Sequence, residues 1–169
     1  MNKKIYQQNK PRTNPWRDKT RQYNCGSFAL NTTDWYCPFN EEEEDDRISL
    51  IREMYDEGFS RETIMESLLE FDQEFILSSC PWVEPILLSE AKADDRLIAY
   101  RLFLDKDMLE AGEVDEDYHF RVRINGFWFE KCGEEEVRFC GIAADEEPWK
   151  TTSYLVYDSD VKYFRFKKI

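Results

Sequence analysis

The stretch YHFRVRINGFWFEKC, residues 118–132, decides the fold. Its first seven residues alternate between apolar and polar side chains, which is the period of a β-strand with one buried face. Asn125 and Gly126 follow, and this dipeptide is typical of the two-residue turn that joins antiparallel strands. The aromatic residues after the turn favour a returning strand. The stretch therefore predicts an antiparallel hairpin.

A two-residue turn fixes which residues of the hairpin face one another, because partners lie equally far from the turn. The pairs predicted on one face are Arg123 with Trp128, Arg121 with Glu130, and His119 with Cys132. The opposite face, which carries Phe120 and Val122, is expected to turn towards the core. The only histidine of the chain is therefore predicted on the polar face of its strand, with the carboxylate of Glu130 diagonal to it.

Two helices are predicted between residues 41 and 78, because apolar residues recur there at spacings of three and four. These apolar positions are Ile48, Ile51, Met54 and Tyr55 in the first helix and Ile64, Leu68, Phe71 and Phe75 in the second. Gly58 fits the end of the first helix, and Ser60 fits the N-cap of the second. A shorter helix is predicted over residues 25–30, where the chain reads CGSFAL.

Further strands are predicted at residues 96–104, 137–142, 154–157 and 162–168. Helices followed by antiparallel strands indicate the α+β class, with the N-terminal helices packed on an antiparallel β-sheet. We expect a single domain over residues 1–169. Its predicted parts are an irregular arm at 1–22, a helical part at 23–80 that carries Cys25, and an antiparallel sheet at 95–169 that carries His119.

The composition fits a folded chain of the cytoplasm. Apolar residues make up 41% of the 169 residues, which is enough for a hydrophobic core that needs no disulfide or structural metal. No apolar run reaches the length of a membrane span, and polar residues follow the basic N-terminus where a signal peptide would place an apolar run. The five cysteines are odd in number and show no C-x-x-C spacing, so we expect reduced thiols, with no metal site and no cofactor.

The acidic residues raise a question about partners. The net charge is −13, which disfavours direct binding to nucleic acid and gives no reason to expect a membrane partner. Acidic residues gather in one run at 41–46 and again around 105–117. In one interpretation, such runs are solvent-exposed faces, or they lie at the positive N-terminus of a helix. In the other interpretation, the acidic surface of Glu41, Glu42, Glu43 and Glu44 mimics nucleic acid and blocks a basic cleft on a partner protein.

Cys25 and His119 are the residues that we expect to carry chemistry. A thiol at the start of a helix experiences the positive end of the helix dipole, which is expected to lower its pKa. His119 is the one available imidazole base, and Glu130 lies on the right face to orient it. Candidate residues for the oxyanion hole or the cleft are Gln22, Tyr23 and Asn24.

Simpler interpretations exist for the same residues. A cysteine beside apolar residues is more often a small core residue than a nucleophile. Arg121 opposite Glu130 can be an ordinary cross-strand ion pair. Cys132 is a rival partner of His119, although nothing in its mid-strand position would lower its pKa.

The order of these residues resembles the papain-like cysteine peptidase superfamily, and its NlpC-type members in particular. The motifs NCGSFAL at 24–30, DYHFR at 117–121 and W-x-x-K-x-G at 128–133 resemble the patterns N-C-x-x-Y-A-L, D-Y-H-F and W-x-H-K-x-G of phage-associated proteins. The matching positions are scattered from 22 to 168 and leave the middle helices uncovered. The third polar position, a histidine in those relatives, is Glu130 here, and carboxylates also orient histidines.

The resemblance implies a papain-like fold and a phage-encoded amide hydrolase, which would be a peptidase, an amidase or a deamidase acting in the host bacterial cytosol. NlpC-type enzymes cleave peptidoglycan stem peptides, and a protein amide is the other substrate that we consider. Deamidation or transglutamination of a partner's glutamine uses the same chemistry. The alternative function is that of a non-catalytic acidic phage protein, which binds and inhibits a host defence or nucleic-acid-binding protein.

Overall fold

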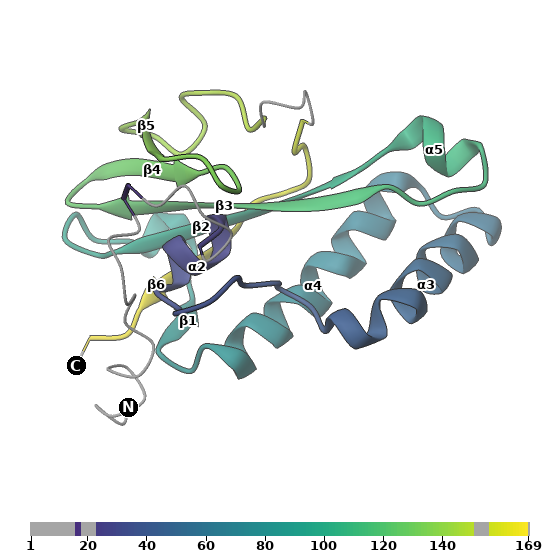
Figure 1. Cartoon of the computed structure of the whole chain (residues 1–169), viewed down its shortest axis with the longest axis horizontal. Coiled ribbons are helices and arrows are strands. Elements are labelled where there is room, and N and C mark those ends of the chain that lie inside the picture. The colour runs from purple at the N-terminus through teal and green to yellow at the C-terminus, as the bar shows by residue number, and fades with distance from the viewer. Residues whose placement is uncertain (1–15, 18–22, 151–155, 169) are drawn as a thin grey trace.

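The computed structural model describes residues 16–17, 23–150 and 156–168, and the helices of its first half precede most of its strands (Figure 1). The α-helices are α2 (Cys25–Leu30), α3 (Glu44–Asp56), α4 (Arg61–Ser79) and α5 (Lys106–Glu110), with short 3-10 helices η1 (Glu41–Glu43) and η2 (Leu88–Glu90). The strands are β1 (Val83–Pro85), β2 (Leu97–Leu104), β3 (Glu116–Ile124), β4 (Phe127–Lys131), β5 (Val137–Gly141) and β6 (Lys162–Phe166). The predicted α+β class is confirmed.

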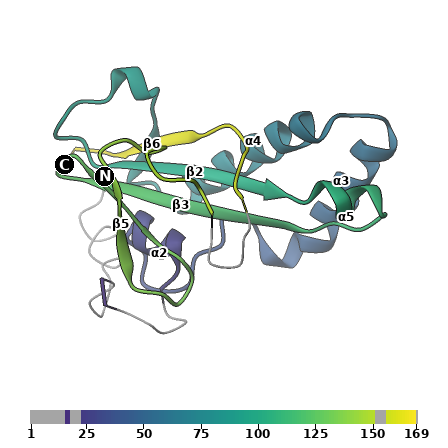
Figure 2. The same cartoon turned by 90° about the horizontal axis from the view of Figure 1, so that it is seen from above.

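The strands form one antiparallel sheet in the order β1-β6-β2-β3-β4-β5. Strands β2 and β3 are the longest pair and extend together towards α5 (Figure 2). They lie in the middle of the sheet, and β3 pairs with β2 at Glu116–Arg123 but with β4 only at Arg121–Ile124. No helix within the described ranges is long and apolar enough to cross a membrane.

The predicted hairpin is confirmed as β3 and β4. Asn125 and Gly126 have φ angles of 52° and 84°, the left-handed values that a type I′ turn requires. The register pairs Arg121 with Glu130 as predicted. Strand β4 ends at Lys131, so Cys132, the predicted partner of His119, lies just beyond the ladder.

The predicted helices are also confirmed, and their caps explain their bounds. The Asn24 side chain accepts a hydrogen bond from the Ser27 backbone and begins α2, and the Ser60 side chain does the same for Thr63 at the start of α4. Gly58, with φ of 91°, follows the end of α3.

Some elements differ from the prediction. The sequence pattern did not predict β1 or α5, which are only three and five residues long. Half of the strand expected at 154–157 falls outside the described residues, and Val156 forms an isolated bridge with Lys150. The strands expected at 96–104, 137–142 and 162–168 are present with ends within two residues of those predicted.

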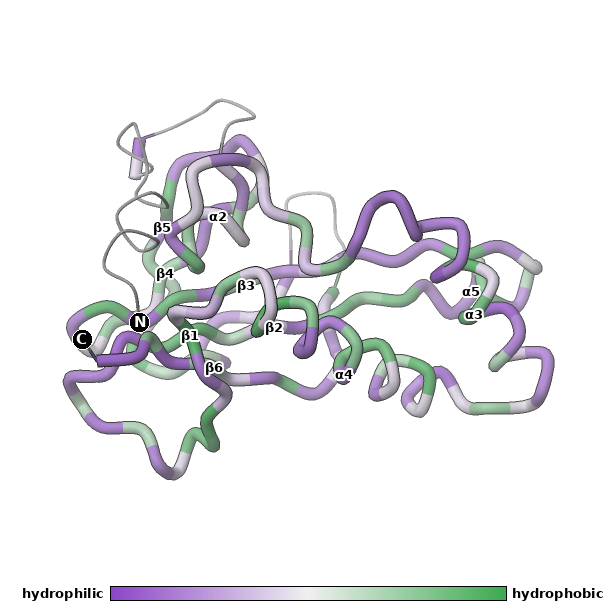
Figure 3. The backbone as a smooth tube through the Cα atoms, turned by 90° about the horizontal axis from the view of Figure 1, so that it is seen from below, coloured by the Kyte–Doolittle hydropathy of each residue, from purple (hydrophilic) through white to green (hydrophobic). Residues whose placement is uncertain are grey.

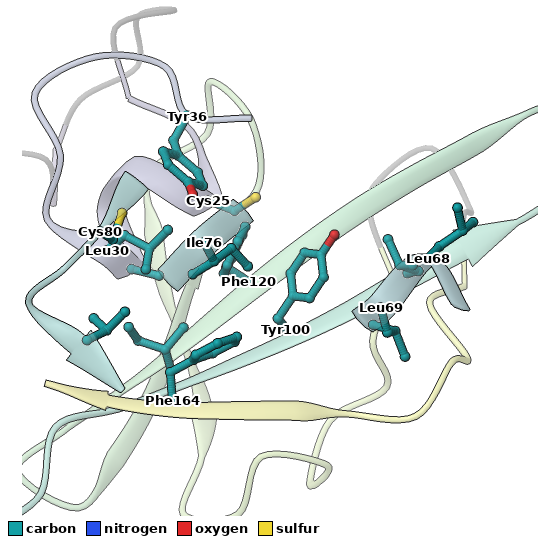
Figure 4. Packing of buried hydrophobic residues seen from close by; sticks show 14 of the residues in the cluster. Cys25, Leu30, Tyr36, Leu68, Leu69, Ile76, Cys80, Tyr100, Phe120 and Phe164 are labelled. Carbon is teal, nitrogen blue, oxygen red and sulfur yellow. The ribbon is translucent and has the colours of Figure 1, made fainter. Parts of the chain in front are cut away.

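Both faces of the sheet carry a buried core. On one face, α2 and α4 pack on Tyr100, Phe120 and Phe164 (Figure 4). On the other, a second cluster contains Trp128, Trp149 and Tyr157. The face of β3 that is predicted to be polar is covered, because the segment after β5 folds back across it.

Candidate functional site

Glu130 is the centre of a buried charged cluster on β3 and β4. Its side chain is fully buried, and its two oxygens accept from three residues. His119 Nε2 and Arg121 Nε lie 2.8 Å and 2.9 Å from Oε2, and Arg138 Nε lies 2.6 Å from Oε1. Burial alone would raise the pKa of Glu130, but the hydrogen bond and charge of His119 and the charge of Arg121 lower it to about 2. Glu130 is therefore ionised at neutral pH.

The ionised carboxylate fixes the tautomer of His119. A carboxylate without a proton only accepts hydrogen bonds, so Nε2 of His119 carries the hydrogen that it donates to Glu130. In the neutral imidazole, Nδ1 then holds the lone pair and is the basic atom. The ring is held in place by Tyr157, which stacks on it at 5.2 Å, and by the edge of Trp149 at 6.0 Å. This is the geometry of an oriented general base.

Arg121 connects this cluster to the segment that covers it. The guanidinium is fully buried and donates to the carbonyl oxygens of Ala144, Glu147 and Pro148 at 2.6–2.9 Å. It also lies 4.5 Å from the ring centroid of Trp149. The sequence predicted only a cross-strand pair with Glu130, which is confirmed. The extra role was missed, because three backbone oxygens of an aperiodic loop leave no signal in the sequence.

Cys25 is the first residue of α2 and lies beside β3, next to Tyr36 and Phe120 in Figure 4. Burial raises the pKa of its thiol well above the ordinary value, although the backbone N–H groups of Phe120 and Gly26 act on the sulfur in the opposite direction. The expected lowering of this pKa was therefore wrong. A dipole effect falls off within one turn, whereas removal from water penalises the thiolate strongly.

The groups that act on the Cys25 sulfur place it beside the histidine strand. They include the backbone of Phe120, the residue after His119, and the charge of Asp117. Gly26 permits this approach of α2, because a Cβ there would lie 2.9 Å from Cδ1 of Tyr36 and 3.2 Å from Cε2 of Phe120. The structure therefore joins Glu130 directly to His119. It places Cys25 against the same strand in the cluster that packs on Phe120, whereas the ring of His119 packs on Trp149 and Tyr157 of the opposite face.

Of the residues predicted for the oxyanion hole or the cleft, the structure describes Tyr23 and Asn24. The side-chain NH₂ group of Asn24 donates to the Tyr36 carbonyl at 2.7 Å and to the Tyr118 hydroxyl at 3.2 Å, so its role is to shape the loop before and after α2. Tyr23 is fully buried. Gln22 lies outside the described residues.

Cys132 completes a group of three possible metal ligands. One ligand atom each of His119, Glu130 and Cys132 lies within 4.8 Å of the others. Burial and the charge of Glu130 raise the pKa of Cys132 to about 11, so the thiol is protonated. Both oxygens of Glu130 already accept from arginines, and a bound cation would have to displace them. These residues therefore fit a role in orienting His119 better than a role in binding a metal ion.

The predicted partner-binding residues Glu41, Glu42, Glu43 and Glu44 are exposed. They form η1 and the first residue of α3, elements separate from the strands that carry His119 and Glu130. In Figure 3, hydrophilic residues (purple) gather near α3 and α5. The position of Glu41–Glu44 at the start of a helix also agrees with the helix-dipole interpretation.

No protein-family model, curated protein or solved structure was found to match the chain.

Proposed function

We propose that the chain is an amide hydrolase with a papain-like core, in which Cys25 is the nucleophile, His119 the general base and Glu130 the residue that orients the base. The observation that carries the proposal is the buried 2.8 Å contact between His119 Nε2 and Glu130, which leaves Nδ1 as the basic atom. A histidine held in one tautomer by an ionised carboxylate is the central part of a catalytic triad. Cys25 at the start of α2, against the same strand, supports the assignment of the nucleophile.

The raised pKa of Cys25 determines how the reaction would proceed. The resting nucleophile is a protonated thiol, because burial disfavours the thiolate. Nδ1 of His119 removes the thiol proton as the sulfur attacks the carbonyl carbon of an amide, and Glu130 stabilises the imidazolium. His119 then gives this proton to the leaving amine. Water, activated by the same histidine, hydrolyses the thioester and regenerates the thiol.

The proposed mechanism defines a class of substrates. A peptide bond, a side-chain amide of glutamine and a peptidoglycan stem peptide all present the carbonyl that this mechanism attacks. We propose a peptide or protein amide as the substrate and a phage-encoded enzyme of the host bacterial cytosol as its setting, on the resemblance of the motifs around Cys25 and His119.

The test is the rate at which iodoacetamide alkylates Cys25 at neutral pH, measured by mass spectrometry of its peptide. Cys37 is the internal control, because it is more exposed and its pKa is also raised, to about 11. We expect His119→Ala to slow the alkylation of Cys25 by about 100-fold and to leave that of Cys37 unchanged. If the rate at Cys25 does not respond to His119→Ala, the proposed function is wrong.

A second candidate function is favoured by the six exposed acidic residues at 41–46. A non-catalytic protein would use this surface to bind and inhibit a basic host protein. The two candidates differ in their sensitive residues, since an enzyme loses its function on Cys25→Ser and tolerates charge reversal at Glu41–Glu44. A binding protein shows the opposite pattern.

A further inference from the structure

A hollow between α3 and α4 lies on different elements from the strands that carry His119 and Glu130. Its volume is about 250 Å³. Its apolar lining consists of Phe39, Leu50, Leu68, Phe71 and Phe75. Phe71 is 56% exposed, although it lies on a helix whose other apolar residues are mostly buried. An aromatic ring left in water beside a hollow favours coverage by an apolar group.

The polar residues at the base of the hollow bind one another. Arg47 donates to both oxygens of Asp72 at 2.7 Å and 3.1 Å, and its Nε donates to Glu116 at 2.6 Å. Tyr100 donates to Asp72 at 2.6 Å. The Arg47 guanidinium also lies 4.2 Å from the ring centroid of Phe39. The opposite charges at the base therefore pair with one another, and what the hollow offers a ligand is mainly apolar contact.

The rim of the hollow is acidic. Glu43 and Asp46 line it, and they belong to the run of acidic residues at 41–46, all of which are exposed. Within the described part of the chain, Arg47 is the cation nearest to them in sequence, and it is already bound to Asp72 and Glu116. This surface therefore attracts positive charge around an apolar centre.

We propose that the hollow and the acidic segment 41–46 together bind a basic segment of a partner protein, with one apolar side chain of that segment seated against Phe39 and Phe71. The volume is smaller than that of pockets for drug-sized ligands and fits one side chain. Anionic lipid and nucleic acid are repelled by the rim. The proposal rests on the second candidate function and is independent of the Cys–His chemistry.

The experiment uses fluorescein-labelled peptides in which Trp, Leu or Gly stands between flanking Arg and Lys residues, and it measures their binding by fluorescence anisotropy. Phe71→Ser removes the exposed wall of the hollow. Phe139→Ser is the matched control, because Phe139 is 53% exposed and lies on β5. Thermal unfolding and the alkylation rate of Cys25 verify that each variant keeps its fold.

We expect the Trp and Leu peptides to bind at least about ten-fold more tightly than the Gly peptide. Phe71→Ser is expected to abolish this difference and Phe139→Ser to preserve it, while Glu43→Gln with Asp46→Asn weakens all three peptides and flattens the salt dependence. If the three peptides bind equally, the surface attracts charge only, and the proposed hollow site is wrong although an acidic binding function stands. If none of the peptides binds, both ideas are overturned.

Discussion

Replacement of Glu130 by glutamine perturbs the charged cluster with the least change of shape. The substitution removes the negative charge that two buried partners, His119 and Arg121, share. The pKa of Glu130 lies at about 2 instead of the ordinary 4.5, a difference that corresponds to roughly 3 kcal/mol of folding free energy. Loss of one partner from a buried ion pair costs about 3–5 kcal/mol. We therefore expect Glu130→Gln to lose roughly 3–5 kcal/mol of stability.

The pH dependence of stability measures the contribution of Glu130 to the folding free energy without relying on one variant. A carboxyl group whose pKa is lowered by folding stabilises the protein above its unfolded pKa, and that stability is lost as pH falls through the folded pKa. For Glu130 the loss falls between about pH 5 and pH 2. The assay is urea unfolding of the wild type and of Glu130→Gln across this range. The free energy of unfolding of the variant should lack the pH-dependent part that the Glu130 carboxyl group contributes in wild type.

A second substitution separates charge from packing. Arg121→Met in the Glu130→Gln background removes the buried cation that the first change leaves without its partner. We expect the double variant to lose less stability than the sum of the two single changes, with a coupling free energy of about 1–3 kcal/mol. If Glu130→Gln costs less than about 1 kcal/mol, or if the two changes simply add, the buried cluster is not the unit that we describe.

Further expectations concern the cover of the site, the approach of α2 and a helix cap. Arg121→Lys cannot reproduce the bonds of the guanidinium to the segment after β5, so limited proteolysis should cleave that segment faster than in wild type, while Arg123→Lys should not change the rate. Gly26→Ala should destabilise the fold by about 1–3 kcal/mol in urea unfolding, and Cys25 alkylation should no longer depend on His119. Wild-type stability of this variant would show that α2 can accommodate a Cβ at this position. Ser60→Ala should cost about 1 kcal/mol in thermal unfolding through loss of the N-cap, and an unchanged midpoint would contradict the cap.

The hairpin and the helices were predictable because their signals are local. A turn dipeptide and an alternating pattern determine β3 and β4 with their register, which is why His119 and Glu130 were placed correctly relative to each other. Helix periodicity and caps did the same for α3 and α4. Short elements such as β1 have too few residues for a pattern, so they escaped prediction.

Features that depend on tertiary burial were not predictable. The polar face of β3 is covered by Trp149 and Tyr157, which come from an aperiodic segment. The same burial turns Arg121 into the anchor of that segment. It also explains the error about Cys25, since the helix dipole is visible in the sequence and the desolvation of its thiol is not.

The most direct test of the central claim is acetyl transfer from 4-nitrophenyl acetate to Cys25, followed by release of nitrophenolate and by mass spectrometry of the cysteine peptides. We expect wild type to be acetylated at Cys25 and then to lose the acetyl group to water, so that nitrophenolate release continues beyond one turnover. His119→Ala should do neither, while its other cysteines keep their slow background labelling. Equal acetylation of Cys25 in wild type and His119→Ala would contradict the claim that this histidine acts on this thiol.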